Sequence, residues 1–263
     1  MLRRAATLAG VIGLLIVLSG CTMDAPFATA RKSAPSETEQ VAQAAYSIGD
    51  YQESARLYEL AAGRDPRSVE ALLGLGRSYI GLGQYSRASN ALTRAHDLSK
   101  NNADVLNELG TLALMQMHPK VAIEHFDRAL RSDRKNLSAF TGKAVSLDYL
   151  SRHAEAQAVY SDALTYYPTN FALLNNFALS KVLSGDIGGG TALMEELLRD
   201  PSRGDTVRAN MAIAYALDGR TRDARAMLEG TMSSGDIDVT LRHYANAREA
   251  YLLGKPIGYM IFN

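Results

Sequence analysis

The chain repeats a pattern of residue sizes every 34 residues. A frame that starts at Pro35 runs through six consecutive copies without an insertion or a deletion. Position 8 of this frame holds only Gly or Ala, and position 20 holds only Gly, Ala or Ser. Position 24 is large in every copy: Tyr58, Leu92, Phe126, Tyr160, Met194 and Leu228. Because small residues let helices approach closely and a large one fills the space beside them, the period predicts stacked helix pairs.

This period, with its small–small–large order, is typical of the tetratricopeptide repeat (TPR), a helix–turn–helix unit. The resemblance implies an all-α fold: a right-handed α-solenoid of six TPR units, followed by a C-terminal capping helix. The frame places the repeats at residues 35–68, 69–102, 103–136, 137–170, 171–204 and 205–238, and the capping helix and tail at 239–263. TPR arrays bind other proteins through extended concave surfaces.

Capping and turn residues recur at fixed places in the frame. Ser36 and Glu39 form a capping box at the start of the first helix. Position 15 is Gly in four copies, where the turn between the helices benefits from a permissive backbone. Position 34 holds residues that can cap the next helix: Ser68, Asn102, Asn136 and Asn170.

Two segments depart from the regular frame. Gly188, Gly189 and Gly190 open the second helix of the fifth repeat. Since each helical Gly costs about 1 kcal/mol relative to Ala, we expect this helix to start late or to fray. We interpret the segment as a degenerate repeat, and a functional hinge is the alternative. The apolar tail 257–262 is expected to pack back on the solenoid rather than serve as a docking peptide.

The first twenty residues have the pattern of a lipoprotein signal peptide. Arg3 and Arg4 precede an apolar run from Leu8 to Leu18 that is too short for an ordinary membrane span. The run ends in Leu-Ser-Gly followed by Cys21, the single cysteine of the chain, and this order resembles a bacterial lipobox. The resemblance implies that Cys21 carries a diacylglycerol and an acyl chain. An ordinary signal peptide with an incidental cysteine is the alternative.

The resemblance to lipoproteins also bears on localisation. Residues 21–34 are rich in Ala, Ser, Thr and Pro and are expected to form a flexible tether. Thr22 follows the cysteine, and the best-known sorting rule retains lipoproteins with Asp at that position in the inner membrane. Thr22 therefore favours a lipid anchor in the outer membrane, with the protein facing the periplasm.

Composition and motifs argue against several other classes of function. The 28 basic and 28 acidic residues balance and form no basic stripe, so we expect no nucleic-acid partner. The single cysteine and five scattered histidines form no metal-binding pattern. There is no Gly-x-Ser-x-Gly or His-Glu-x-x-His motif. We therefore expect no enzyme activity, no small-molecule substrate, no metal and no cofactor apart from the lipid.

The protein-binding surface is expected on the concave face of the first helix of each repeat. In TPR folds, positions 2, 5, 9, 12 and 13 face this groove. Positions 9, 12 and 13 become apolar toward the C-terminal repeats, which fits docking of an amphipathic helix or an extended segment. The alternative is that these side chains only pack against adjacent repeats. The predicted groove residues are Arg77, Thr111, Leu114, Met115, Val145, Tyr149, Leu179, Val182, Leu183, Ile213 and Leu217.

The repeats beyond Ala139 resemble a narrower family, the TPR lipoprotein of tight-adherence (Flp-type) pilus systems. The matching stretches are residues 152–157, Asn175-Asn176, residues 183–186, and residues 208–220. The three glycines of the fifth repeat depart from that family's pattern. The resemblance implies a pilotin-like scaffold that assembles or localises the pilus secretin in the outer membrane. The main alternative is a lipoprotein adaptor for peptidoglycan hydrolases or other envelope assembly machinery.

Overall fold

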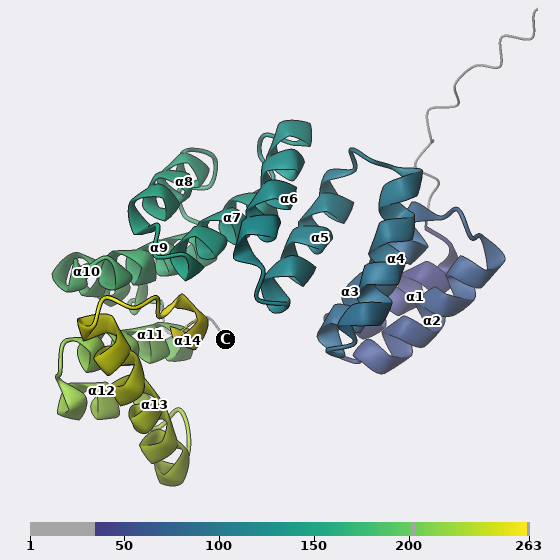
Figure 1. Ribbon diagram of the computed structural model, residues 1–263. Coiled ribbons are helices and arrows are strands. Elements are labelled where there is room, and N and C mark those ends of the chain that lie inside the picture. Colours follow the sequence, from purple (N-terminus) through teal and green to yellow (C-terminus); the bar gives the residue numbers. More distant parts are fainter. Residues whose placement is uncertain (1–34, 201–203, 262–263) are drawn as a thin grey trace, which may run out of the picture. The chain divides into compact units, whose positions relative to one another are not determined.

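The computed structural model describes residues 35–200 and 204–261, and within them every named element is a helix (Figure 1). The helices follow one another as antiparallel pairs. Their bounds are α1 Glu37–Ser47, α2 Tyr51–Arg64, α3 Val69–Gly81, α4 Tyr85–Leu98, α5 Ala103–Met115, α6 Pro119–Ser132, α7 Leu137–Tyr149, α8 His153–Tyr166, α9 Phe171–Leu183, α10 Ile187–Leu197, α11 Gly204–Leu217, α12 Thr221–Leu228, α13 Ser234–Leu252 and α14 Gly258–Ile261. The expected all-α architecture is confirmed.

The predicted caps lie where the frame puts them. The Ser36 hydroxyl accepts from the Glu39 amide, and the Glu39 carboxylate accepts from the Ser36 amide, which completes the capping box. The four position-34 residues cap the first helices of the next four repeats with their side-chain oxygens. Since an N-cap side chain satisfies amides that have no partner within the helix, these residues set the start of α3, α5, α7 and α9.

The turn at position 15 has a positive φ angle in all six repeats. Four copies use glycine, with φ between 68° and 96°. The other two place Met117 (φ 62°) and Ser151 (φ 56°) in the same left-handed conformation. That conformation costs a residue with a Cβ roughly 1–2 kcal/mol. The helix–turn–helix geometry therefore imposes this backbone conformation on the sequence.

Two helix starts differ from the sequence-based expectation. Helix α10 begins at Ile187 and includes all three glycines, because the Asp186 side chain caps it by accepting from the Gly189 amide. The expectation that this helix starts late was wrong. Helix α13 begins at Ser234, before the expected residue 239, because Ser233 caps it. Helix α12 accordingly ends early, at Leu228.

The core is organised around the large residue at position 24. Phe126 on α6 is almost fully buried. A Cβ added to Gly110 would lie 2.7 Å from the Phe126 ring, and a Cβ added to Gly142 would lie 2.3 Å from it. Gly110 is position 8 of the same repeat, whereas Gly142 is position 6 of the next repeat. Tyr58 lies in the same way against Gly74, at position 6 of the second repeat. The large side chain thus joins consecutive repeats as well as the two helices of its own repeat.

Candidate functional site

The first helices of the six repeats present their position-13 residues in two different environments. Ser47, Gly81 and Met115 are exposed in repeats 1–3. Tyr149, Leu183 and Leu217 are buried in repeats 4–6. Position 9 shows the same trend, from exposed Gln43 and half-buried Arg77, Thr111 and Val145 to buried Leu179 and Ile213. The predicted groove is therefore divided into an accessible N-terminal part and a covered C-terminal part.

Arg77 is the central charged residue of the N-terminal part. Its Nε donates to the Glu108 carboxylate at 2.8 Å, and both side chains are partly buried. Burial opposes the charge of Arg77, but Glu108, Asp104 and Glu70 outweigh this effect and raise its pKa above the ordinary value. Three carboxylates surrounding one guanidinium give this part of the groove an acidic character.

Tyr58 belongs to the core, at 2% exposure, and its hydroxyl donates to Oε1 of the position-9 residue Gln43 at 3.2 Å. Burial, with the Glu70 carboxylate nearby, raises the pKa of Tyr58 to about 12, so its phenol stays protonated at neutral pH. Thr111 is half-buried, Met115 is 42% exposed, and Leu114 is buried. Sequence reasoning identified Arg77, Thr111 and Met115 but missed the acidic residues around Arg77. Two of these, Glu70 and Asp104, occupy position 2, which the frame already assigned to the groove.

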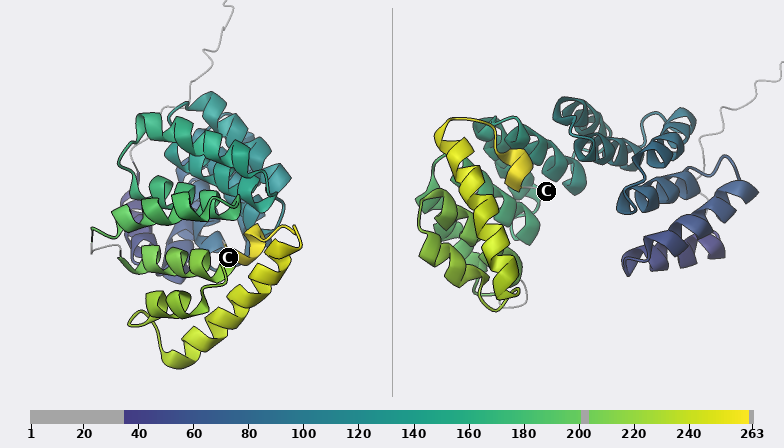
Figure 2. Two further views of the ribbon diagram at one scale, coloured as in Figure 1. Left: turned by 90° about the vertical axis from the view of Figure 1, so that its left-hand side faces the viewer. Right: turned by 60° about the horizontal axis from the view of Figure 1, so that its bottom comes forward.

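The C-terminal part of the groove is covered by the chain itself. Leu179, Leu183, Ile213 and Leu217 form one buried cluster with Val182 and with Ile257 of the C-terminal segment. Met260 and Ile261 of α14 pack against the same cluster. In Figure 2, α13 crosses beside α11 and α12, and the chain then returns to α14. The expected packing of the tail on the solenoid is confirmed for residues 257–261.

The burial of these residues corrects the expectation that they line an accessible binding surface. The leucines and Ile213 have exposed fractions of only 3–5%, so a partner has no access to them while the C-terminal segment is in place. Val182 is fully buried and Tyr149 nearly so. The cluster holds both Ile257 and side chains of neighbouring helices such as Met194 and Val207, and Val182 lies against Gly190 of α10. The apolar pattern therefore reflects packing against adjacent helices together with residues 257–261, and the spacing of the repeats could not reveal the second contribution.

Asp148, on α7, is fully buried. Its Oδ1 accepts from the Ser180 hydroxyl and from His153 Nδ1, both at 2.8 Å, while Oδ2 has no hydrogen-bond partner. Burial raises the pKa of Asp148, and the two hydrogen bonds partly offset that effect. The serine and the histidine both contact the carboxylate rather than each other. This cluster joins α7, α8 and α9 and does not have the geometry of a catalytic triad.

No group of three or more candidate metal ligands occurs among the described residues. No helix within 35–200 and 204–261 has the length and apolar character required to cross a bilayer. Cys21, the proposed site of lipidation, and the tether 21–34 lie outside the described residues.

Comparison with known proteins identifies the architecture. The Tetratricopeptide repeat family profile matches residues 45–107. A solved tetratricopeptide repeat protein from Parabacteroides merdae superposes with a TM-score of 0.65, covering 82% of this chain and 88% of that one at 16% identity. The fold is a tetratricopeptide repeat solenoid. The structure of PilW, described as a widely conserved type IV pilus biogenesis factor, superposes with a TM-score of 0.66 at 20% identity, covering 78% and 96% of the two chains.

Sequence relatives add a second line of comparison for this chain. PilF of Pseudomonas aeruginosa, a type IV pilus assembly protein, is 29% identical over 119 residues, which is 44% of this chain and 47% of PilF. Protein y4yS of Sinorhizobium fredii is 36% identical over 84 residues, 32% of this chain and 46% of that one. The chain spans less than half the length of the curated relatives that it matches.

Proposed function

We propose that this protein is a membrane-anchored TPR scaffold that binds a protein partner of a pilus assembly system. The proposal rests on the accessible groove of repeats 1–3, where Arg77 and its carboxylate neighbours offer charged hydrogen-bonding groups. The sequence similarity to PilF supports a role in pilus assembly. Because the repeats resemble those of tight-adherence lipoproteins, we propose that the partner is the Flp-type pilus secretin and that the role of the protein is pilotin-like.

Lipidation of Cys21 is part of this proposal. A diacylglycerol and a further acyl chain together anchor a protein stably, because each buried CH₂ contributes about 0.8 kcal/mol. The anchor would hold the solenoid at the outer membrane on its periplasmic face. Cys21→Ser should leave an unprocessed precursor without radiolabelled palmitate. Identical migration and no label in both wild type and variant would refute the anchor.

The groove is tested with a pair of matched substitutions. Met115 is the last residue of α5 and lies in the accessible groove, whereas Leu98 is the last residue of α4. Their exposures are similar, at 42% and 37%. Met115→Glu should weaken capture of the secretin and reduce its multimers in the outer membrane, and Leu98→Glu should not. Anchor residues of an interface typically contribute 2 kcal/mol or more, so the loss should be at least about tenfold.

The outcomes separate the two candidate roles. Loss of secretin multimers in both the deletion strain and the Met115→Glu strain supports the pilotin-like role. Normal multimers and normal pili in a deletion strain would refute the pilus assignment and favour the adaptor for other envelope machinery. Normal multimers in the Met115→Glu strain alone would place the binding surface outside the N-terminal groove.

A further inference from the structure

The boundary between the accessible and covered parts of the groove coincides with one contact of the C-terminal segment. Position 13 changes from exposed to buried between Met115 and Tyr149. Gly258, the first residue of α14, is buried against the backbone of Tyr149 and Asp148. The C-terminal segment 254–261 therefore begins to cover the groove at the fourth repeat and extends over the repeats that follow.

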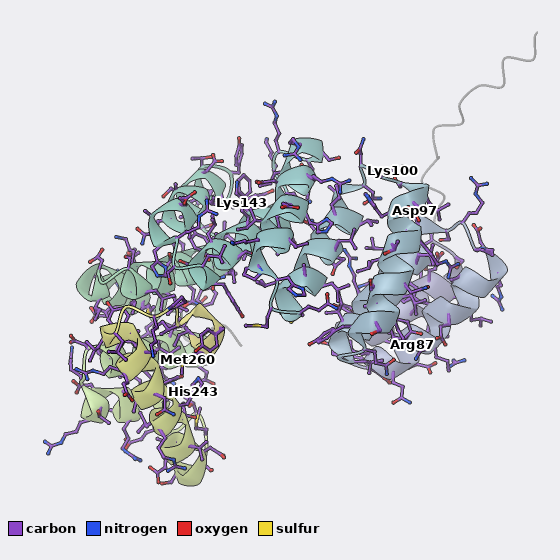
Figure 3. All side chains as sticks on the ribbon, viewed as in Figure 1. Arg87, Asp97, Lys100, Lys143, His243 and Met260 are labelled. Atoms are coloured by element: carbon purple, nitrogen blue, oxygen red, sulfur yellow. The ribbon has the colours of Figure 1, made fainter. Side chains whose placement is uncertain are left out.

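The segment is held by apolar burial and by a polar contact at its end. Ile257 is 3% exposed within the cluster formed by α9 and α11. His243 on α13 lies beside Met260, and its Nε2 donates to the Met260 carbonyl at 2.7 Å (Figure 3). Met260 and Ile261 are only partly buried. The segment thus lies in the groove as a short apolar ligand would, with its backbone close to the solenoid.

The contact at Gly258 is selective for glycine. A Cβ at this position would lie 2.6 Å from Tyr149 Cα, 2.9 Å from the Asp148 carbonyl oxygen and 3.0 Å from the Tyr149 amide nitrogen. All three atoms belong to the backbone of α7, so they cannot move aside as the end of a side chain could. Any larger residue would lift the segment away from the groove.

We propose that the groove of repeats 4–6 is a binding site for a short apolar peptide segment with a glycine at the point of closest approach. The chain's own segment 254–261 is the resting occupant of this site. The partner is a protein segment that carries an apolar residue, a glycine, one variable residue and two further apolar residues in order. This inference rests on the proposed scaffold function and names a second surface for it.

The covalent connection explains why a free partner meets a closed site. A segment joined to the solenoid by a short linker competes with a free partner at an effective concentration in roughly the millimolar range. The connection runs through exposed Gly254, Lys255 and Pro256, which form no part of a helix. A partner present at micromolar concentration must therefore bind the open groove roughly a thousandfold more tightly than the segment does, whereas a peptide of the same sequence competes at millimolar concentration.

The test uses the full chain and a capped, fluorescein-labelled peptide with the sequence of residues 254–261. Gly258→Leu in the protein should lift the segment, so the peptide should bind this variant at least tenfold more tightly than wild type in fluorescence anisotropy. Lys255→Ala changes an exposed residue of the same segment and should behave like wild type. A peptide that itself carries Gly258→Leu should not bind any of these proteins.

Circular dichroism checks that the solenoid of each variant remains folded. If Gly258→Leu loses helix content, Ile257→Asp provides a second way to dislodge the segment without obstructing the backbone contact. On the unaltered chain, millimolar peptide should accelerate amide hydrogen exchange in residues 258–261 and leave α5 unchanged. Equal binding to wild type and variant, no binding to a folded variant, or unchanged exchange in α14 would each overturn the proposal. These results do not depend on secretin assembly, so they stand apart from the test of the pilus role.

Discussion

The packing of Phe126 against Gly142 leads to a quantitative prediction for a single added methyl group. Gly142 lies inside α7, and a Cβ there would be 2.3 Å from Cζ of the Phe126 ring and 2.6–2.7 Å from two further ring carbons. The ring is 1% exposed and also lies against Gly110, so it has little room to move. Gly142→Ala therefore tests whether the ring is fixed between consecutive repeats.

Two opposing effects determine the magnitude. Replacing glycine by alanine inside a helix stabilises it by about 1 kcal/mol. Overpacking a well-filled core costs about 1–3 kcal/mol. The expected net effect of Gly142→Ala is a loss of stability of up to about 2 kcal/mol. Gly63→Ala on α2 is the matched control, because a Cβ there would meet nothing within 4 Å. The control should gain up to about 1 kcal/mol.

Urea denaturation followed by circular dichroism measures both variants. Phe126→Leu removes the ring, so in this background Gly142→Ala should cost much less, and a double-mutant cycle gives the interaction energy directly. Because repeat arrays need not unfold in one step, the midpoints of matched variants are compared. If Gly142→Ala stabilises the protein as much as Gly63→Ala, the ring is not fixed as described and the account of repeat-to-repeat packing is refuted.

Three further predictions concern the turns, the buried carboxylate and the covered groove. Met117→Gly should be neutral or stabilise the protein by up to about 1 kcal/mol, because Met117 has a positive φ angle. Gly83→Ala, at the equivalent turn of the second repeat, should cost about 1 kcal/mol. Thermal melts in which both variants lose the same stability would contradict the turn geometry. Burial raises the pKa of Asp148, so the folded state favours its protonated form and this contribution to stability declines as pH rises from about 4 through the raised pKa. In urea titrations, the unfolding free energy of wild type minus that of Asp148→Asn should therefore fall over that pH range. A constant or rising difference would show that the pKa of Asp148 is not raised in the folded state. The double variant Leu179→Glu, Ile213→Glu buries two unpaired charges and should lose several kcal/mol and much of its helical signal; an unchanged melt would mean that these side chains are exposed.

The helices and their caps were predictable because their causes are local. Asn102 caps α5 through contacts with amides two and three residues away, and Ser36 and Glu39 do the same for α1. The triple glycine was misinterpreted because propensity was considered without the Asp186 cap, which stabilises the first turn of α10. Local hydrogen bonding in this case outweighed an unfavourable composition.

The sequence by itself determined the repeat period, the helix pairs, their caps and the small-to-large packing code, because each depends on residues within one repeat or in the next. The tertiary structure decided which part of the groove is accessible. Leu183 and Leu217 have the spacing of groove residues, but they lie in a buried cluster to which Ile257 and α14, far along the chain, contribute. Asp148 has a polar side chain at a groove position, and only the packing of Ser180 and His153 around it shows that it is internal. A period in the sequence defines which face a side chain occupies, whereas its exposure depends on what folds back over that face.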